Sequence, residues 1–373
     1  MKIVSLIDSS AGFVQATTLS RALRRKHAET LVQVGPRAEF FQARTYFEHI
    51  DLLEPEVKVE IGTTPHGVPL GEMLIRLERV LLDLRPDLVI IRGDSSATLA
   101  GALAAARHFI PVARLQAGAR SYNKRLPHEL NRVLADRLAD VLFCNTHLAA
   151  QRLAEEGIVS GVHFCGDVEL DIVRHQLPVA RQHSTILQRV GLYPGYYLLA
   201  VLHAAAPAQG LHDFPGVVKA LNSIREPIVF PMSAQLRIVF DKLDLVLAPH
   251  VLAIDPLGYL DMLSLETHAR AIITDVESVQ CAAYHLAVPC ITLCDDTVVR
   301  ETVAAGWNCL VGSQTDRIVD AVRDFLPPLD HPPLFGDGHA ADQIADVLSA
   351  QPIVFGQNYD RVMVPVPACT VSV

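Results

Sequence analysis

The chain has 373 residues, of which 50% are hydrophobic and 20% charged, a composition typical of a globular protein long enough for two domains. The formal net charge of -9 argues against a nucleic-acid partner, because phosphate binding relies on clustered lysine and arginine. No stretch reaches the roughly 20 apolar residues of a membrane span. The apolar run in the start MKIVSLIDSS is too short for a signal peptide. We therefore expect a cytoplasmic protein without membrane contact.

The seven cysteines show no paired spacing, which favours a reducing compartment. Cys290 and Cys294 would share one face of a strand, but a structural zinc site needs four ligands. We therefore predict neither a metal site nor a cofactor.

Strands and helices alternate from residue 2 to residue 165. Short unbroken apolar runs are typical of parallel strands buried on both faces, and they predict strands at 2–7, 31–34, 88–91, 111–115, 141–144 and 163–165. Helical spacing predicts helices at 13–26, 70–84, 97–108, 126–138 and 146–156, whereas 50–68 is rich in Pro and Gly and is predicted to be irregular. This alternation predicts an α/β fold with a doubly wound parallel sheet.

The turn between the predicted strand 88–91 and the helix 97–108 holds the first candidate site residue, Asp94. Open α/β sheets bind ligands beyond the carboxyl ends of their strands, which is where this turn would lie. Ser95 or Ser96 would cap the helix that follows. The alternative is that Asp94 itself is only the cap.

A second alternation follows residues 166–190, which we interpret as the crossing to a second domain. Strands are predicted at 197–202, 227–230, 251–254, 271–274, 290–293 and 309–311, and helices at 215–224, 259–269, 276–285, 298–304 and 316–325. Two such sheets leave a cleft between them, and clefts between domains bind small ligands.

An ordered set of motifs now identifies a family: RGDSSATLAGALAA, AGARSYN, PHELNRVLADRLAD, FCNT, DPLGYLDML, TDVESVQCAA and FGDGHAADQIADVL. With these motifs the chain resembles the non-hydrolysing UDP-N-acetylglucosamine 2-epimerases over about residues 1–349, which leaves 350–373 outside. The resemblance implies a GT-B fold of two Rossmann-like domains facing a cleft, at 1–166 and 167–333, with a helix within 334–349 returning to the first domain. It also implies a homodimer through first-domain helices, for which Leu99, Leu103 and the helix 70–84 offer apolar faces.

The reaction implied by the resemblance is anti elimination of UDP across C1 and C2 of the sugar, then re-addition with C2 inverted. It needs a base for the C2 proton, an acid for the departing oxygen, and cations with helix N-termini for the diphosphate. Asp94 matches the catalytic aspartate of the family. The substrate-binding positions that the resemblance implies are Ser10, Arg120, Glu129, Asn131, Arg132, His203, Asp275, Ser278, Gln280 and Arg300.

Several positions depart from the family pattern in the first domain. The family's Glu-Ala-Gly is replaced by Gln116-Ala117-Gly118, and an amide cannot act as a carboxylate base. Its Pro-Glu-Glu is replaced by Pro127-His128-Glu129, and histidine can still move protons near neutral pH. In the first loop Ser10 stands for an arginine and Gln15 for a lysine. The alternative for His128 is a cap of the helix after Pro127.

The second domain departs in the same way. Ala204 and Ala205 replace paired arginines after His203, and the diphosphate turn Asp-Ser-Gly-Gly is replaced by Asp275-Val276-Glu277-Ser278. His203 has the alternative of a buried histidine at a strand end. We therefore predict a nucleotide-sugar epimerase lineage, acting on ligands of the UDP-GlcNAc or UDP-ManNAc type, with weakened or altered activity. The alternative is a non-catalytic or repurposed GT-B protein that binds another ligand.

Overall fold

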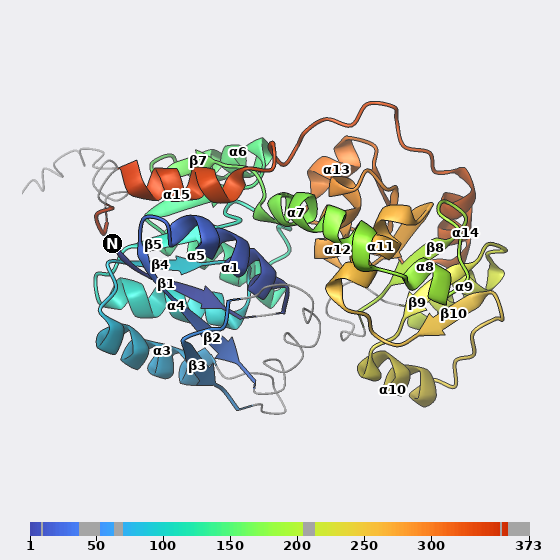
Figure 1. The fold of residues 1–373 in the computed structure, drawn as a ribbon, viewed down its shortest axis with the longest axis horizontal. Helices are drawn as coiled ribbons and strands as arrows, with labels where there is room; N and C mark the ends of the chain where they lie inside the picture. The colour runs from blue at the N-terminus through green and yellow to red at the C-terminus, as the bar shows by residue number, and fades with distance from the viewer. Residues whose placement is uncertain (9, 37–52, 63–69, 204–212, 351–352, 357–373) are drawn as a thin grey trace, which may run out of the picture.

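The computed structural model describes residues 1–8, 10–36, 53–62, 70–203, 213–350 and 353–356. Figure 1 shows two α/β domains side by side, each built on its own sheet, with the helix α7 (Val168–His183) between them. The first sheet has seven strands and the second has six, and every strand pair in both is parallel. The prediction of two doubly wound α/β domains is therefore confirmed.

The first sheet has the strand order β3-β2-β1-β4-β5-β6-β7. Its strands are β1 (Lys2–Ile7), β2 (Ala28–Gly35), β3 (Val57–Glu60), β4 (Leu88–Ile91), β5 (Val112–Leu115), β6 (Val141–Cys144) and β7 (Val162–Phe164). Its helices are α1 (Ser10–Leu23), α3 (Leu70–Leu84), α4 (Ser96–Arg107), α5 (Pro127–Leu138) and α6 (His147–Glu155).

The second sheet has the order β10-β9-β8-β11-β12-β13. Its strands are β8 (Leu198–Val201), β9 (Ile228–Pro231), β10 (Val251–Ile254), β11 (Ala271–Thr274), β12 (Cys290–Thr292) and β13 (Asn308–Leu310). The helices that follow α7 are α8 (Ile186–Arg189), α9 (Phe214–Ser223), α10 (Ala234–Lys242), α11 (Tyr259–His268), α12 (Glu277–His285), α13 (Arg300–Ala304), α14 (Thr315–Asp324) and α15 (Ala340–Ala350).

Both strand orders reverse direction at one point, between β1 and β4 in the first sheet and between β8 and β11 in the second. Such a reversal opens a crevice at the carboxyl ends of the two strands, because the loops leave to opposite faces of the sheet. Asp8 follows β1 and Asp94 lies in the turn after β4, while His203 and Asp275 follow β8 and β11. The topology therefore gathers these positions at the two switch points.

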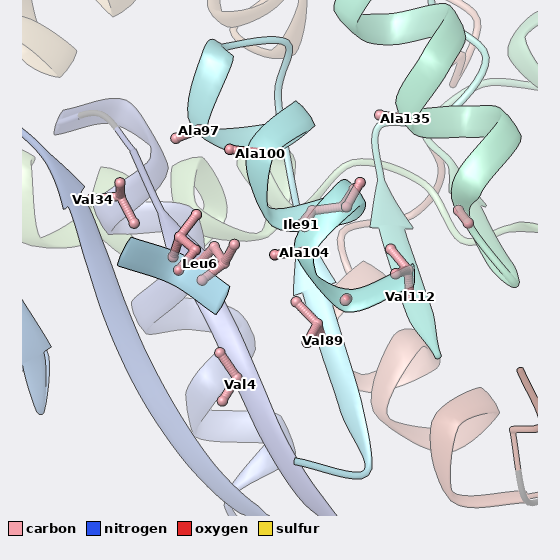
Figure 2. Packing of buried hydrophobic residues seen from close by; sticks show 14 of the residues in the cluster. Val4, Leu6, Val34, Val89, Ile91, Ala97, Ala100, Ala104, Val112 and Ala135 are labelled. Atoms are coloured by element: carbon pink, nitrogen blue, oxygen red, sulfur yellow. The ribbon is translucent and has the colours of Figure 1, made fainter. Parts of the chain in front are cut away.

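Small residues let α4 lie close against the first sheet. Ala100 and Ala104 are fully buried against strand residues that include Leu6 and Val89, as Figure 2 shows. A Cβ on Gly101 would lie 2.2 Å from Leu6 Cδ1, so the Leu6 side chain would have to shift if residue 101 carried one. This close packing fixes the start of α4 and, with it, the turn that carries Asp94.

The last described helix, α15, lies along α1 of the first domain (Figure 1). Ile344 and Leu348 are buried in the same core as α1, and Asp171 of α7 accepts hydrogen bonds from the backbone amides of Ala340 and Ala341 at 3.1 and 2.7 Å. The chain thus returns to the first domain, while the domain boundaries proposed from sequence stay a prediction.

The sequence prediction did not include β3, α7, α8 or α10. The segment predicted to be irregular contains β3, a short edge strand that alternates Val57 and Val59 with polar residues. The predicted crossing contains α7, a 16-residue helix that tolerates Pro178 in its interior. The helix α10 was missed, although Ser233 caps it by accepting from Leu236 N at 3.2 Å. Among the helices within the described ranges, none is long and apolar enough to cross a bilayer.

Candidate active site

A cavity of about 250 Å³ lies between the two domains. Its walls combine charged and polar side chains from both domains. The first domain contributes Asp8, Gln15, Arg92, Asp94, Arg114, Gln116 and Arg132, and the second contributes Glu277, Ser278, Cys281 and Glu301. A concave site with converging titratable groups is the usual form of an active site.

The Asp94 carboxylate is free of any capping role. Ser95 caps α4, because its hydroxyl accepts from the amides of Ala97 and Thr98 at 3.1 and 3.2 Å. The backbone carbonyl of Asp94 accepts from Asn131 Nδ2 at 2.8 Å, which holds the turn against α5. The alternative that Asp94 only caps the helix is therefore wrong.

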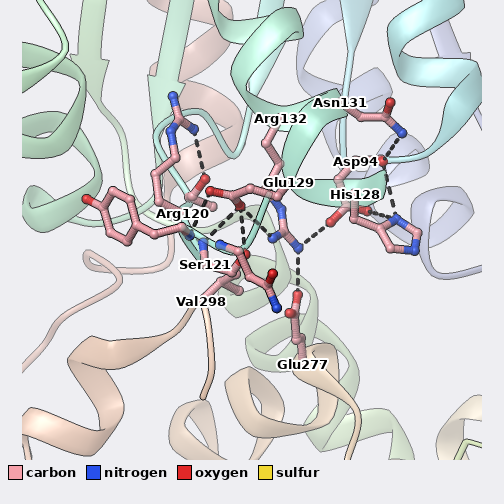
Figure 3. Close-up of polar contacts among 12 residues, drawn as sticks. Asp94, Arg120, Ser121, His128, Glu129, Asn131, Arg132, Glu277 and Val298 are labelled. Atoms are coloured by element: carbon pink, nitrogen blue, oxygen red, sulfur yellow. Dashed lines mark hydrogen bonds and ion pairs between the residues drawn. The ribbon is translucent and has the colours of Figure 1, made fainter. Parts of the chain in front are cut away.

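Two cationic groups of α5 contact the Asp94 carboxylate (Figure 3). Arg132 Nη2 donates to Oδ2, and His128 Nδ1 lies 3.5 Å from Oδ1. Burial acts to raise the pKa of Asp94, but His128 and Arg132 outweigh it and lower that pKa to about 2. The hydrogen bond with Asp94 in turn raises the pKa of His128. The pair is thus an ionised carboxylate beside a histidine that holds its proton more tightly than usual.

Glu129, next to His128, holds the preceding loop. Its carboxylate accepts from Ser121 N and Oγ, both at 2.9 Å, and from Tyr122 N at 2.8 Å. Burial acts to raise the pKa of Glu129, yet these hydrogen bonds lower it overall. Glu129 therefore supports the site from behind, and its Oε2 lies 3.4 Å from Arg132 Nη1.

Gln116 lines the cavity with a left-handed backbone at a φ of 56°. Positive φ is costly for a residue with a side chain, and such strain gathers at functional sites. The Gln116 carboxamide thus occupies the position at which the family pattern has a carboxylate. The turn that holds it requires a left-handed backbone, which is unfavourable for a residue with a side chain.

The Arg120 guanidinium is fully engaged in a buried network of ion pairs behind the cavity. It donates to Asp136 Oδ2 at 2.6 Å and to Glu156 at 2.7 and 2.8 Å. Arg114 donates to Asp136 at 2.8 Å and to the carbonyl of Gly93 at 2.6 Å, which supports the Asp94 turn. Arg120 is outside the cavity lining, whereas Arg114 belongs to it.

Glu277 from the second domain reaches the same cluster. Its Oε2 accepts from Arg132 Nη2 at 3.0 Å, so Arg132 binds carboxylates of both domains. Burial raises the pKa of Glu277 in spite of the Arg132 charge. Ser278 follows it at the start of α12 and also lines the cavity.

Four predicted positions of the second domain remain: His203, Asp275, Gln280 and Arg300. His203 is exposed, so the alternative of a buried histidine is wrong, and its backbone amide donates to Asp275 Oδ1 at 2.8 Å. Gln280 is buried and accepts from Thr297 Oγ1 at 2.7 Å, while Arg300 pairs with Asp296 at 2.9 Å. None of these side chains belongs to the described lining. Ser10 begins α1, but its side chain lies outside what the structure describes.

Sequence reasoning missed Arg92 and Arg114. Both are almost fully buried at the ends of apolar strands and both line the cavity. A cation inside an apolar strand is costly unless it is paired or functional, and this cost was the signal that could have identified them.

One group of possible metal ligands exists among the described residues: Asp167, Glu169 and His285. His285 Nε2 lies 3.5 Å from Asp167 Oδ2, an arrangement that an ordinary histidine–carboxylate pair also gives. None of the predicted site residues belongs to this group.

Known proteins with a similar sequence or fold agree with one another. The family model for UDP-N-acetylglucosamine 2-epimerase matches residues 21–349. A homolog of that enzyme from Methanococcus maripaludis is 34% identical over 93% of this chain and 99% of its own length. The UDP-2,3-diacetamido-2,3-dideoxy-D-glucuronate 2-epimerase of Pseudomonas aeruginosa is also 34% identical, over 94% of this chain and 99% of its own.

The fold gives the same result. The crystal structure of Methanocaldococcus jannaschii UDP-GlcNAc 2-epimerase in complex with UDP-GlcNAc and UDP has a TM-score of 0.84 and 30% identity, and the match covers 94% of this chain and 100% of that one. The chain therefore belongs to the UDP-N-acetylglucosamine 2-epimerase family of nucleotide-sugar epimerases.

Proposed function

We propose that this protein inverts C2 of a UDP-linked 2-acetamido sugar bound in the interdomain cavity, with Asp94 and His128 acting together in proton transfer. The observation that carries the proposal is the contact between these two side chains, whose pKa values are shifted in opposite directions. Pairs of titratable groups with pKa values driven apart are the usual basis for dividing acid and base roles.

The direction of each shift assigns the roles. A carboxylate with a pKa of about 2 is a weak base, so Asp94 is poorly suited to take a carbon-bound proton by itself. It is well suited to orient the imidazole of His128 and to stabilise its protonated form. His128, when neutral, then accepts the C2 proton as the C1–O bond breaks and UDP leaves as an anion held by Arg132, and it returns a proton to C2 when UDP adds back.

Gln116 supports binding without supplying charge. Its carboxamide donates and accepts hydrogen bonds to sugar oxygens but cannot ionise. Because a positioned acid or base typically contributes roughly 10²- to 10⁴-fold in rate, the loss of a carboxylate here predicts a slower reaction than a complete site would give.

The other candidate residues divide into contacting and positioning groups. Arg132 and Ser278 line the cavity and are proposed to bind the diphosphate together with Ser10. The remaining candidates hold these groups in place or lie around the cavity: Arg120, Glu129, Asn131, His203, Asp275, Gln280 and Arg300.

The relatives define the class of ligand. The Methanocaldococcus jannaschii protein is a UDP-GlcNAc 2-epimerase, and the Pseudomonas aeruginosa relative is named for a UDP-linked diacetamido glucuronate. We take a UDP-activated acetamido sugar as the ligand. A non-catalytic or repurposed role is not favoured, because the relatives that match nearly the whole chain are epimerases.

Exchange of the C2 proton is the direct test. The protein is incubated with UDP-GlcNAc or its uronate counterpart in deuterated water, and deuterium at C2 is followed by NMR. We expect slow epimerisation with deuterium at C2, abolished by Asp94→Asn and retained by Asp83→Asn, which changes an exposed carboxylate of α3. Binding of the sugars without any C2 exchange would exclude the reaction.

We also propose a homodimer in the cytoplasm. Leu99 is buried within its own domain and is unavailable for an interface, but Ile75 and Leu82 on α3 and Leu130 and Leu134 on α5 are exposed apolar residues on helices next to α4. Large exposed apolar side chains gathered on neighbouring helices are typical of association surfaces. Sedimentation at micromolar concentration tests the dimer, and Ile75→Glu should shift the protein to monomer.

A further inference from the structure

Arg92 stands out among the arginines that line the cavity. It follows β4 directly, is 3% exposed, and donates from Nη1 to the carbonyl of Gly12 at 2.8 Å. Its Nε and Nη2 atoms are buried and have no hydrogen-bond partner among the residues that the structure describes. Arg114 and Arg132, in the same lining, each bind carboxylates, and Arg152 donates to the carbonyl of Val298 at 3.4 Å.

A buried guanidinium whose N–H donors lack acceptors is unfavourable unless a ligand supplies those acceptors. Removing an ion from water costs several kcal/mol, in order of magnitude, and only a partner repays that cost. Burial lowers the pKa of Arg92 to about 10, and the charges of Asp8 and Glu29 only partly oppose this, so the side chain stays protonated at neutral pH. Arg92, one of the residues that line the cavity, therefore keeps its positive charge and has two buried donors without a partner among the described residues.

The geometry of these donors selects the ligand group. Nε and Nη2 lie on one edge of the planar guanidinium and point the same way, an arrangement that matches the two oxygens of a carboxylate. Asp8 also lines the cavity, and its charge acts on Arg92, which leaves little room for a second negative charge. A carboxylate and each phosphate of a UDP-sugar carry one negative charge alike, so shape decides between them, and the planar pair of donors matches the planar carboxylate.

We propose that Arg92 binds the C6 carboxylate of a uronic-acid sugar, so that the ligand of this cavity is a UDP-linked acetamido uronate. The inference rests on the proposed function, because it places the sugar in the first domain beside Asp94. The diphosphate is then placed at Arg132 and Ser278, as proposed above.

The test compares two ligands that differ at C6 alone, UDP-N-acetylglucosaminuronate and UDP-GlcNAc, with UDP as a third. Titration calorimetry on the unmodified protein should give roughly 10- to 100-fold tighter binding of the uronate, the range expected for a charge-assisted hydrogen-bond pair. In Arg92→Gln the preference should fall to near one, with the affinity for UDP unchanged. Arg92→Lys should keep part of the preference, because it keeps the charge and loses the fork.

Each outcome decides the proposal. Equal affinity for the two sugars in the unmodified protein would overturn it, and so would a variant that weakens UDP and both sugars alike, since Arg92 would then hold the diphosphate. A uronate preference without any C2 exchange would retain this inference while rejecting the proposed function.

Melting temperature serves as the control for correct folding of the variants. Without ligand, Arg92→Gln should melt at or above the temperature of the unmodified protein, because it removes an unpaired buried charge. Arg79→Gln removes the same charge from the exposed face of α3 and should leave the sugar preference unchanged. A loss of stability larger than that of one hydrogen bond to the Gly12 carbonyl would show that Nε and Nη2 also have partners in the ligand-free protein, and the inference would fail.

Discussion

Arg132 and Glu277 join the two domains across the cavity, with Nη2 of the arginine 3.0 Å from Oε2 of the glutamate. The same nitrogen also donates to Asp94. One guanidinium thus neutralises a carboxylate from each domain, and an incoming diphosphate has to compete with Glu277 for it.

Removal of this competitor should strengthen nucleotide binding. Glu277 begins α12, whose N-terminal amides and dipole favour anions, so its own negative charge opposes a phosphate at that place. Glu277→Gln should lower the Kd for UDP about tenfold, and less at high salt, because salt screens the repulsion that the substitution removes. Calorimetry with UDP at two salt concentrations measures this. Glu155→Gln on the exposed face of α6 is the matched control, and an unchanged Kd in Glu277→Gln would mean that the glutamate moves aside at no cost.

The Asp94 and His128 pair should give stability a defined pH dependence. The pKa of His128 is raised in the folded protein, so its contribution is complete below the unfolded value of about 6.5 and is lost as pH rises through the folded value. The pKa of Asp94 is lowered to about 2, so its contribution is present above the unfolded value of about 3.9 and is lost as pH falls toward 2. The pair therefore stabilises the fold most between about pH 4 and 6.5.

His128→Asn should cost stability within that window. Because the His128 side chain is 43% exposed, the loss should stay below about 1 kcal/mol. Urea unfolding at pH 5.5 and at pH 8.5 measures it, and the difference between variant and unmodified protein should shrink at the higher pH. A difference that is the same at both values would show that His128 acts by packing alone.

The fold could be predicted from sequence where the signal was periodic and long. The strand at β4 and the alanine-rich α4 follow from apolar runs and helix propensity, and Ser95 caps the helix as its position indicated. The edge strand β3 was not predicted, because four alternating residues between Pro-rich and Gly-rich segments carry little signal. Its identity comes from pairing with β2, which is a tertiary contact.

The residues of the site could be predicted from sequence, but the contacts between them could not. Asp94 and Gln116 line the cavity, and the motifs that carry them are local in sequence. The contact of Arg132 with Glu277 joins residues 145 positions apart and depends on how the domains meet. The open donors of Arg92 depend equally on which groups fail to reach it, and a sequence pattern does not record that.

Gly118 should tolerate no side chain. Its φ is +80°, and a Cβ there would lie 2.2 Å from the carbonyl oxygen of Ala149, which is backbone and cannot rotate away. Gly118→Ala should cost about 3 kcal/mol or more, because left-handed strain adds to a steric clash beside the cavity. Gly157 has a φ of +79° with nothing within 4 Å of its Cβ position, so Gly157→Ala isolates the strain and should cost about 1 kcal/mol. Equal losses in the two variants, measured by urea unfolding, would show that α6 moves freely away from Gly118.

Glu266 should make the protein less stable as pH rises. Burial raises its pKa to about 8, so the folded protein holds a proton that the unfolded chain releases near pH 4.3. The sign follows from proton counting: between these values the folded state binds more protons, and stability falls with increasing pH until it levels off above about 8.

Glu266→Gln keeps the size of the side chain and removes the titration. It should therefore match the unmodified protein near pH 4.5 and exceed it by on the order of 1 to 3 kcal/mol at pH 8.5. Urea unfolding across this range is the measurement, with Glu155→Gln as the exposed control. A parallel pH dependence in Glu266→Gln and the unmodified protein would assign the effect to another buried carboxyl, of which Glu169, beside it, has a pKa raised by burial and by the charges of Asp167 and Glu266.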